Sequence, residues 1–313
     1  MYLFIARRLA SNVVVFIVVC SAAYSLLFLS GASVALNLLG TDATPEQIVA
    51  KEQELGLDQP LLMRLGAWWA KALGGDLGVS WYNGQPVWES IMNRLPMTLA
   101  LVIASTLATV VVAVLLAGSA AVHRGWPDKT IQVLSTIGSA VPNFLIAIFL
   151  VAVFAVQLGW FPAISTISAG AGVGDWVTSL ALPVIALTIG SATAVTQQLR
   201  NGLLSQMDAD YVRTLRSRGT SGLEILTVHV LRNAAPPTLT VLGLQFIGML
   251  GGVVVIEHLF ALSGIGSLAL TATSTSDTPL VMGIVVYTIL VVVIVNLLVD
   301  LLNAWLNPKV RTA

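Results

Sequence analysis

Between two apolar segments, residues 210–233 read DYVRTLRSRGTSGLEILTVHVLRN. The stretch is polar and rich in arginine, and it carries two helix signals. Gly219 can take the left-handed backbone conformation that ends a helix. Ser221 and Glu224 form the S-x-x-E pattern of a capping box, which starts another helix. The stretch therefore predicts two short helices that meet at a glycine, an arrangement suited to docking a soluble partner beside a membrane.

The rest of the chain has the composition of an integral membrane protein. Of its 313 residues, 57% are hydrophobic and 10% are charged, whereas soluble domains average about 25% charged residues. The mean hydropathy of +0.90 agrees. The net charge is zero, so the overall balance says nothing about partners. The single Cys20 cannot form an intrachain disulfide, and the three histidines show no metal-ligand spacing.

Six stretches are apolar and long enough to cross a membrane, which takes about 20 residues. They are residues 9–29, 97–121, 131–157, 179–199, 238–257 and 280–303. The first exceeds the roughly 7–15 apolar residues of a signal peptide, so we expect a retained membrane helix. The sequence predicts an all-α membrane protein with six transmembrane helices. Its expected parts are a first span over 1–29, an outer helical loop over 30–95, a core over 96–303 with a cytoplasmic loop at 200–236, and a tail over 304–313.

The distribution of Lys and Arg sets the expected orientation, because these residues accumulate in cytoplasmic loops. With the N-terminus inside, 11 of the 15 basic residues fall inside and 4 outside. Six spans then place both termini in the cytoplasm of a multi-pass plasma (inner) membrane protein. The reverse orientation would put the arginine-rich stretch outside, against the rule.

Two helices are expected in the outer loop. The first begins at Thr44-Pro45-Glu46-Gln47, an N-cap followed by proline and a Gln at the third position, and ends before Gly56. The second runs from Pro60 to Leu73 and contains Trp68 and Trp69. Its apolar residues favour contact with the membrane surface or a neighbouring subunit. A capping segment without a binding role is the alternative.

Other local signals support the same map of spans. Asp128 and Asp175 are candidate caps for the third and fourth spans, and Thr278 begins the sixth. Gly248 and Gly252 form a G-x-x-x-G in the fifth span, which favours close helix packing.

Charges are nearly absent from the predicted spans. Asp300 is their one clear acid, and Glu257 lies at the outer end of the fifth span. A proton- or sodium-coupled carrier usually needs ionisable groups near the midplane, so their absence disfavours that class. Some polar residues could line a pathway or bond a neighbouring helix. They are Asn143, Thr188, Ser191, Gln245 and Asn296, the last of which begins a stripe with Asp300, Asn303 and Asn307.

No catalytic arrangement is evident. Residues 262–266, LSGIG, superficially resemble the signature of transport ATPases, but they lie on the predicted outer side. The chain also has no G-x-x-x-x-G-K-[ST] loop to hold phosphates, and neither a Ser–His–Asp arrangement nor paired catalytic carboxylates. We therefore expect a protein that is not an enzyme and has no metal site.

With the spans and the arginine-rich stretch placed, the whole chain resembles the permease subunits of dipeptide/oligopeptide (and nickel) ABC importers of type I architecture. The permease motif of that family reads E-A-A-x-x-x-G and, after nine intervening residues, I-x-L-P. Arg213-Thr214-Leu215 occupy the E-A-A places and Gly219 the glycine, while His229 and Leu231 occupy the I and L places. The peptide branch typically reads D-Y-V-R-T-A-R-A-K-G and then H-x-L-R-N, so the resemblance is specific.

Other segments carry the same resemblance. They are residues 55–60, 75–80 and 296–300, together with Glu257, Phe260 and 264–266. Three positions depart from the family pattern: Leu215 replaces a usual alanine, Ser263 a proline and Asn307 an aspartate. Leu215 implies a differently shaped groove on the ATPase.

The resemblance implies a mechanism and partners. A second homologous permease completes the pathway, two cytoplasmic ABC ATPase subunits or domains bind ATP and Mg, and an extracytoplasmic substrate-binding protein delivers the solute. This chain would contact membrane lipid but no nucleic acid, bind no cofactor and hold no catalytic residue. The implied ATPase-coupling residues are Asp210, Tyr211, Arg213, Thr214, Arg216, Arg218, Gly219, Ser221, Glu224, His229, Arg232 and Asn233. The alternatives are a permease for nickel or another small solute, a stand-alone secondary carrier, and a membrane assembly subunit.

Overall fold

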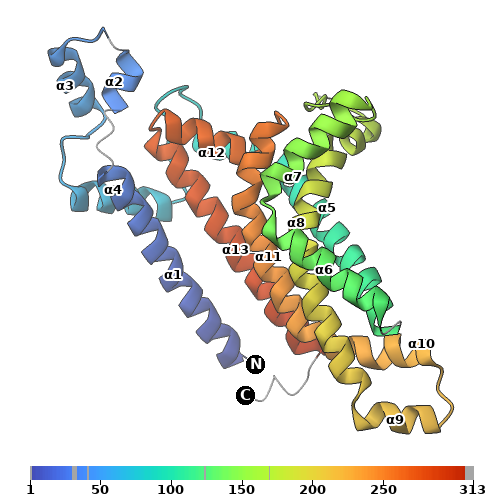
Figure 1. The fold of residues 1–313 in the computed structure, drawn as a ribbon. Helices are drawn as coiled ribbons and strands as arrows, with labels where there is room; N and C mark the ends of the chain where they lie inside the picture. Colours follow the sequence, from blue (N-terminus) through green and yellow to red (C-terminus); the bar gives the residue numbers. More distant parts are fainter. Residues whose placement is uncertain (1, 30–33, 41, 123–124, 169, 307–313) are drawn as a thin grey trace. The chain divides into compact units, whose positions relative to one another are not determined.

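The computed structural model describes residues 2–29, 34–40, 42–122, 125–168 and 170–306. These residues are mostly helical (Figure 1), and their isolated β-bridge joins Val79 and Pro86. The chain divides into two compact units. Unit 1 comprises Met1–Met97 and Ser263–Val293, and unit 2 comprises Thr98–Leu262 and Ile294–Ala313.

Five helical runs within the described residues are long and apolar enough to cross a membrane. They are Ala10–Leu29, Val87–Val122, Val173–Met207, Gly222–Leu259 and Thr278–Leu306. The last four each contain a predicted span and extend it, because polar and capping residues continue the helix beyond the apolar stretch. Ala10–Leu29 covers the predicted span 9–29 except for its first residue. The predicted first, second, fourth, fifth and sixth spans are therefore helices in the structure.

The predicted third span, 131–157, is divided. α6 (Trp126–Ala140) stops before Pro142, and the chain resumes as α7 (Asn143–Leu150), followed by the π-helical segment η1 (Val151–Gln157). Val141 has φ −97° and ψ 121°, the extended backbone that a following proline favours. A single uninterrupted helix over this stretch was therefore wrong.

Among the described residues of unit 1, two buried clusters hold the helices together. Its elements are α1 (Tyr2–Leu29), α2 (Val34–Leu39), α3 (Pro45–Glu54), α4 (Leu61–Leu73), the start of α5 (Val87–Val122), α12 (Ile265–Ser274) and the first part of α13 (Thr278–Leu306). In one cluster, Val87 and Ile91 of α5 pack against α12 and α13. In the other, Cys20 and Tyr24 of α1 pack against Met282 of α13 and the tryptophans of α4.

Both predicted helices of the outer loop are present. Thr44 and Gln47 form a complete capping box, in which Thr44 N donates to Gln47 Oε1 over 2.9 Å. Gly56, just after α3, has φ +66°, a conformation that only glycine adopts readily. α4 follows Pro60 and ends at Leu73, as predicted. The short helix α2 was not predicted.

The tryptophans of α4 pack against α1 of the same chain. Trp68 and Trp69 pack in the cluster that contains Cys20 and Tyr24 of α1, and Trp69 Nε1 donates to Ser21 Oγ over 3.2 Å. These two rings therefore hold α4 against α1, and the surface that α4 offers to lipid or a partner is made by other residues.

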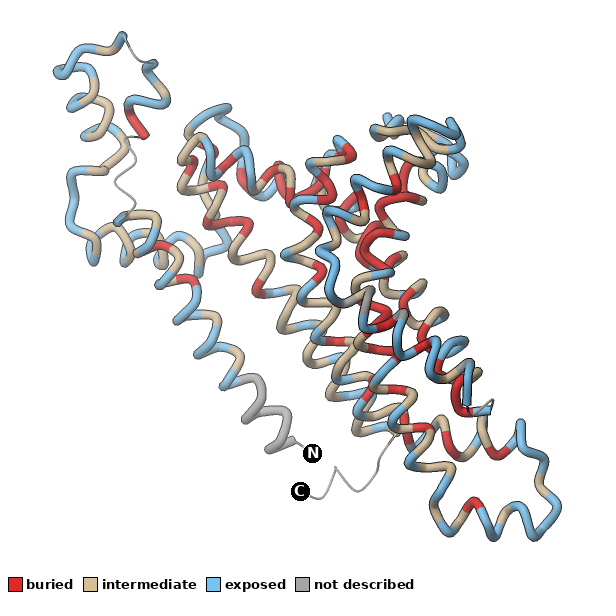
Figure 2. Tube along the Cα trace, in the orientation of Figure 1, coloured by how far each residue is buried: buried red, intermediate tan, exposed pale blue. Residues whose placement is uncertain are grey.

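Unit 2 is organised around the pair α8 (Val173–Met207) and α11 (Leu231–Leu259), which pack along each other. A Cβ on Gly202 of α8 would lie 3.1 Å from Ala234 Cβ of α11, so this glycine permits a close approach. Figure 2 shows buried positions along α8. In the predicted G-x-x-x-G, by contrast, no atom lies within 4 Å of a Cβ on Gly248, and Gly252 meets only ordinary contacts.

The helix caps differ in part from the sequence prediction. Thr278 begins α13 as expected. α8 is capped by Gly172, whose N donates to Asp175 Oδ2 over 3.0 Å, so Asp175 supports the cap from the first turn. α6 has Gly125 at its N-cap. Asp128 is therefore not a cap, because its carboxylate is engaged elsewhere.

Candidate functional site

The arginine-rich stretch is folded, and its first helix ends at the predicted glycine. α9 (Asp210–Ser217) has Arg218 as its C-cap, and Gly219 follows with φ +82°. Thr220 N donates to Leu215 O over 3.1 Å, and Gly219 N donates to Arg216 O over 3.0 Å. These two bonds form a Schellman motif, which requires the left-handed residue that Gly219 supplies.

The second helix starts at the predicted cap but is not short. Ser221 Oγ accepts from Glu224 N over 3.2 Å at the start of α10 (Gly222–Glu224). The chain continues through the π-helical segment η2 (Ile225–Val230) into α11, one helical run from Gly222 to Leu259. The expected second short helix is therefore the end of a membrane-crossing helix, since nothing between Glu224 and Leu231 breaks the backbone.

A small apolar core holds the stretch together. Val212 of α9 and Ile225 and Val230 of η2 are fully buried, and they pack with Leu199 and Leu203 of α8. Ala117 and Ala121 of α5 and Ala234 of α11 also belong to this core. Burying a valine or isoleucine side chain contributes about 1.5–3 kcal/mol. The stretch is thus a folded element packed against α8 and continuous with α11, and its remaining side chains form an exposed surface.

Leu215 belongs to that core. Its side chain packs against the buried cluster. The departure from alanine at this position thus adds apolar contacts at the edge of this core, and the side chain is half-buried.

Most of the predicted coupling residues are exposed on the surface of this folded stretch. The exposed ones are Asp210, Arg213, Thr214, Arg216, Arg218, Gly219, Ser221, Glu224, Arg232 and Asn233, whereas Tyr211 and His229 are half-buried. Arg213 Nη1 lies 3.6 Å from Asp210 Oδ1, with side chains 78% and 98% exposed. An ion pair so exposed contributes little to stability, so the arginines remain available to an acidic partner.

Tyr211 and Asn233 brace this surface from within. Tyr211 Oη donates to Gln206 Oε1 over 3.1 Å, and Asn233 Nδ2 donates to Tyr211 Oη over 3.4 Å. The chain of bonds links the end of α8, α9 and the start of α11. These two residues of the predicted set therefore have a positioning role inside the chain.

An exposed apolar residue lies on the same element and was missed by sequence reasoning. The side chain of Leu223 in α10 is 72% exposed, and Val228 in η2 is also exposed. Large apolar side chains beside arginines are typical of the central part of a protein interface. The sequence gives little indication that Leu223 is exposed, because a single leucine after a capping serine has no pattern that separates an exposed position from a buried one.

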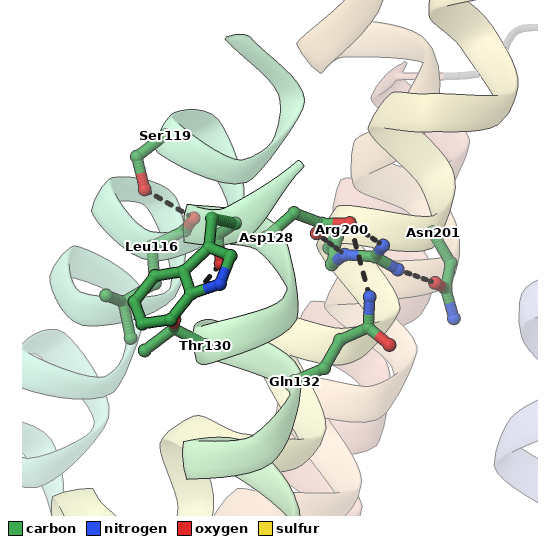
Figure 3. Close-up of polar contacts among 8 residues, drawn as sticks. Leu116, Ser119, Asp128, Thr130, Gln132, Arg200 and Asn201 are labelled. Carbon is green, nitrogen blue, oxygen red and sulfur yellow. Dashed lines mark hydrogen bonds and ion pairs between the residues drawn. The ribbon is translucent and has the colours of Figure 1, made fainter. Parts of the chain in front are cut away.

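A partly buried ion pair joins α6 to α8 (Figure 3). Arg200 Nη2 donates to Asp128 Oδ2 over 2.6 Å and Arg200 Nε donates to Asp128 Oδ1, while the side chains are 14% and 17% exposed. The hydrogen bond from Arg200 holds the pKa of the Asp128 carboxyl below its usual range, and Gln132 adds a weaker one. From the sequence, Arg200 counts only among the basic residues that indicate the orientation, and nothing near it in the chain predicts this pair.

The five pathway candidates have different environments, all in unit 2. Thr188 and Ser191 are buried, and Thr188 Oγ1 donates to Ser105 O of α5 over 3.4 Å. Asn143 lies so close to α8 that a Cβ on Gly190 would be 1.8 Å from Asn143 Oδ1. Gln245 and Asn296 are half-buried. A role in lining a pathway stays a prediction for all five.

The polar stripe of the sixth span makes an inter-helix bond. Asn303 Nδ2 of α13 donates to Thr240 Oγ1 of α11 over 3.2 Å. For Asn303, the structure thus shows the bond to a neighbouring helix that was one of the two alternatives for these polar residues. Asn307 lies outside the described residues.

Glu257 is a fully buried carboxylate near the end of α11. It accepts a hydrogen bond from Thr98 Oγ1 of α5 over 2.6 Å. Burial of a carboxylate is costly unless it is bonded, so this bond ties α5 to α11. Among the residues that the structure describes, no group of three His, Cys, Asp or Glu side chains could hold a metal ion.

Comparisons with known proteins agree on one family. Residues 110–312 match the family described as binding-protein-dependent transport system inner membrane component, and residues 1–102 match its N-terminal counterpart. A protein named as a peptide transport system permease, from Brucella abortus (strain 2308), is 36% identical over 98% of both chains. A glutathione transport system permease protein from Salmonella choleraesuis is 31% identical over 98% of both chains. The MetNI methionine ABC transporter, solved in inward-facing conformations, matches with a TM-score of 0.51 and 17% identity, covering 71% of this chain and 94% of that one.

Proposed function

The chain belongs to the binding-protein-dependent transport system inner membrane component family, and from that premise we propose that it imports peptides and docks an ATPase through residues 210–233. Its fold is that of a type I permease. In such a system ATP is hydrolysed by other subunits, and this chain is a membrane transport subunit. The proposed docking surface consists of the exposed residues of α9, α10 and η2, and Leu223 is its apolar centre.

The continuity of the helices supports a coupling role. The Gly222–Leu259 run joins the docking surface to the membrane without a break, and α8 enters α9 through Asp208 and Ala209. A helix is stiff along its axis, so a displacement of α9 and α10 would move α8 and α11. The buried core at Val212 and Ile225 makes α9, α8 and η2 move together. The continuity of the docking surface with α8 and α11 is the single observation that carries the proposal.

The Asp128–Arg200 pair extends the same linkage. It connects α6 to α8 about two turns before α8 ends at Met207. A movement of α8 would thus reach α6 as well as α11. We assign the pair a positioning role in transmission from the docking surface to the pathway.

Peptide is the proposed cargo because the similar permeases are named for peptide and glutathione transport, and glutathione is itself a small peptide. Nickel or another small solute is the alternative. The proposed assembly adds a second permease, two ATPase subunits that bind ATP and Mg, and an external binding protein. Both termini and residues 200–236 would face the cytoplasm. A stand-alone secondary carrier is disfavoured, because the family works with a binding protein.

Charge reversal on the docking surface tests the proposal. In cells that express the whole transporter, Arg216→Glu should reduce the ATPase that co-purifies with the tagged chain and abolish peptide uptake. Arg216→Lys retains the charge and should remain close to the parent. Both variants should reach the membrane and retain the partner permease. If Arg216→Glu binds the ATPase and transports like Arg216→Lys, the surface is not the docking site.

The cargo is tested separately in the parent strain. Uptake of labelled dipeptide, longer peptide, glutathione and nickel should be measured with and without the chain. Loss of peptide uptake on deletion supports the proposal. Loss of nickel uptake alone would establish the alternative.

A further inference from the structure

The divided third span contacts α8 on both sides of its break. α6 ends at Ala140 and α7 begins at Asn143, and the Val141–Pro142 joint between them has an extended backbone. On the α6 side, a Cβ added to Gly138 would lie 2.8 Å from Thr193 Oγ1 of α8. α7 packs against α8 and also against α11 (Figure 1). The continuous helix α8 therefore supports two halves that are not one helix themselves.

The side-chain amide of Asn143 occupies the place that a Cβ would take on Gly190 of α8. A Cβ at Gly190 would lie 1.8 Å from Oδ1, 2.7 Å from Cγ and 3.0 Å from Nδ2 of Asn143, so only glycine leaves room for this amide. The same Nδ2 lies 3.9 Å from the Cβ position of Gly252 in α11. Asn143 thus lies where α7, α8 and α11 meet, in a seat formed by two glycines, Gly190 and Gly252.

The two halves of the third span are held to α8 in different ways. α6 is bound by the two hydrogen bonds of the Asp128–Arg200 ion pair. The Asn143 side chain is half-buried and forms no hydrogen bond among the described residues. Its contact with the glycine seat is packing alone, and each packing contact is weak. When α8 moves, α6 is therefore tied to it more firmly than the start of α7.

The glycine seat lies on the two helices that carry the proposed docking surface. Gly190 lies 17 residues before Met207, the end of α8, which corresponds to about 25 Å along a helix. Gly252 belongs to the helical run that starts at Gly222. A displacement that moves α8 against α11 would change the distance between the two glycines. Packed contacts respond to such shifts by changing between discrete arrangements.

We propose that Asn143 is a positioning residue for transport, through which movement of α8 against α11 changes the position of α7. The inference rests on the proposed function, which supplies the movement. While the amide fills the glycine seat, α7 is held beside α8. When the seat changes, the amide leaves it and α7 turns about the Val141–Pro142 joint, while α6 stays bound to α8. Rotation at Val141 breaks no helical hydrogen bond of either half, because its backbone is already extended.

A fixed packing contact is the alternative, in which Asn143 only fills space. The two differ when the contact is prevented from opening. The first test uses the complete transporter in liposomes, with Cys20→Ala, Asn143→Cys and Gly190→Cys in this chain. The Cγ of Asn143 is 2.7 Å from the Cβ position of Gly190, so the two sulphur atoms can reach bonding distance.

Oxidation with copper phenanthroline should abolish peptide uptake by the paired-cysteine transporter, and dithiothreitol should restore it. The matched controls carry one of the two cysteines and should be insensitive to both reagents. The fraction of cross-linked chain is measured by intact mass. Undiminished uptake by fully cross-linked transporter would show that the seat does not open, which overturns the proposal.

A substitution cycle decides the matter even if the paired cysteines disturb the reduced transporter. Gly190→Ala expels the amide and should lower uptake about tenfold, which corresponds to about 1.4 kcal/mol in a rate barrier. Uptake should fall more than ATP hydrolysis, since the docking surface is unchanged. With Asn143→Ala added, the new Cβ has room, and uptake should return to the level of Asn143→Ala alone. The control is Gly251→Ala in α11, where a Cβ meets nothing within 4 Å.

Losses that multiply in the double variant, or a Gly190→Ala transporter that imports like Gly251→Ala, would overturn the proposal. Failure of the proposed function is recognised separately. If Arg216→Glu retains the ATPase, the docking surface is wrong, whereas the effect of the cross-link still decides the role of Asn143. If the parent hydrolyses ATP and imports another solute in place of peptide, the same variants are compared with that solute.

Discussion

Arg200 of α8 holds Asp128 of α6 in a two-bonded ion pair, and neither side chain is more than 17% exposed. The pair joins two helices that are far apart in the sequence and meet only through folding. Removal of one partner leaves the other charge partly buried and without its partner, which is destabilising.

We therefore expect Asp128→Asn to lower the free energy of unfolding by about 1–3 kcal/mol. The double variant Asp128→Asn with Arg200→Gln should lose less than the sum of the single variants, because the second change removes the stranded charge. Thermal unfolding in nanodiscs measures this coupling. Asp210→Asn, which breaks the exposed pair with Arg213, is the control and should cost less than about 0.5 kcal/mol. Additive losses at Asp128 and Arg200 would contradict an energetic link.

The same pair predicts a pH dependence. The pKa of Asp128 is lowered in the folded protein by the hydrogen bond from Arg200, whereas an unfolded Asp titrates near 3.9. A depressed folded pKa stabilises the protein above the unfolded value, and this stability is lost as the pH falls through the folded value. The difference in stability between the parent and Asp128→Asn should stay constant from pH 7 to about 5 and shrink below about 4. A difference that grows on acidification would contradict the assigned sign.

Gly219 should be required for coupling and not for membrane insertion. Its φ of +82° costs a residue with a side chain about 1–2 kcal/mol, so Gly219→Ala should distort the turn between α9 and α10. Peptide uptake and substrate-stimulated ATP hydrolysis should fall at equal amounts of protein in the membrane. The matched control is Gly222→Ala, where the glycine is helical and a Cβ meets nothing within 4 Å. Equal transport by the two variants would remove Gly219 from the transmission element.

Leu223 should anchor the ATPase. Because its side chain is 72% exposed, Leu223→Ala removes little from the fold of this chain. Only a minority of interface residues cost more than about 1 kcal/mol when truncated, and these cluster near the centre of the interface. As the proposed centre, Leu223 should be one of them, so affinity for the purified ATPase should fall roughly fivefold to tenfold in Leu223→Ala. Leu62→Ala, at an exposed leucine of α4, should leave that affinity unchanged. An unchanged affinity in Leu223→Ala would place the docking centre elsewhere.

The proposed orientation predicts which positions react with an impermeant thiol reagent on intact cells. In a Cys20→Ala background, Gln85→Cys should be labelled and Ser217→Cys should not, and both positions are exposed. Ser80 is unsuitable as a probe, because it is buried and its hydroxyl donates to Asp277. Ser217→Cys should react once the cells are permeabilised. Its labelling in intact cells would reverse the orientation.

Local signals in the sequence were enough for most helices. The capping box at Thr44, the end of α3 before Gly56 and the turn at Gly219 were predicted from residues close in the chain, because a cap needs only its own neighbours and a suitable φ. Five of the six predicted spans are long helices in the structure, because the hydrocarbon thickness sets the length of an apolar run. The family resemblance was also available from the sequence and is confirmed by the comparisons.

The tertiary structure decided which side chains meet. Sequence reasoning placed Trp68 and Trp69 on an outer surface and Asp128 at a cap, but α1 covers the tryptophans and Arg200 binds the aspartate. It inferred from Leu215 only the shape of a groove on the ATPase, and the structure shows that this side chain also packs against a buried core of the chain itself. In a helix a period of 3.6 residues gives the faces, but which face is covered depends on helices distant in the sequence. An apolar side chain can contact either lipid or another helix, so hydropathy alone could not distinguish lipid-facing helix faces from faces that pack against protein.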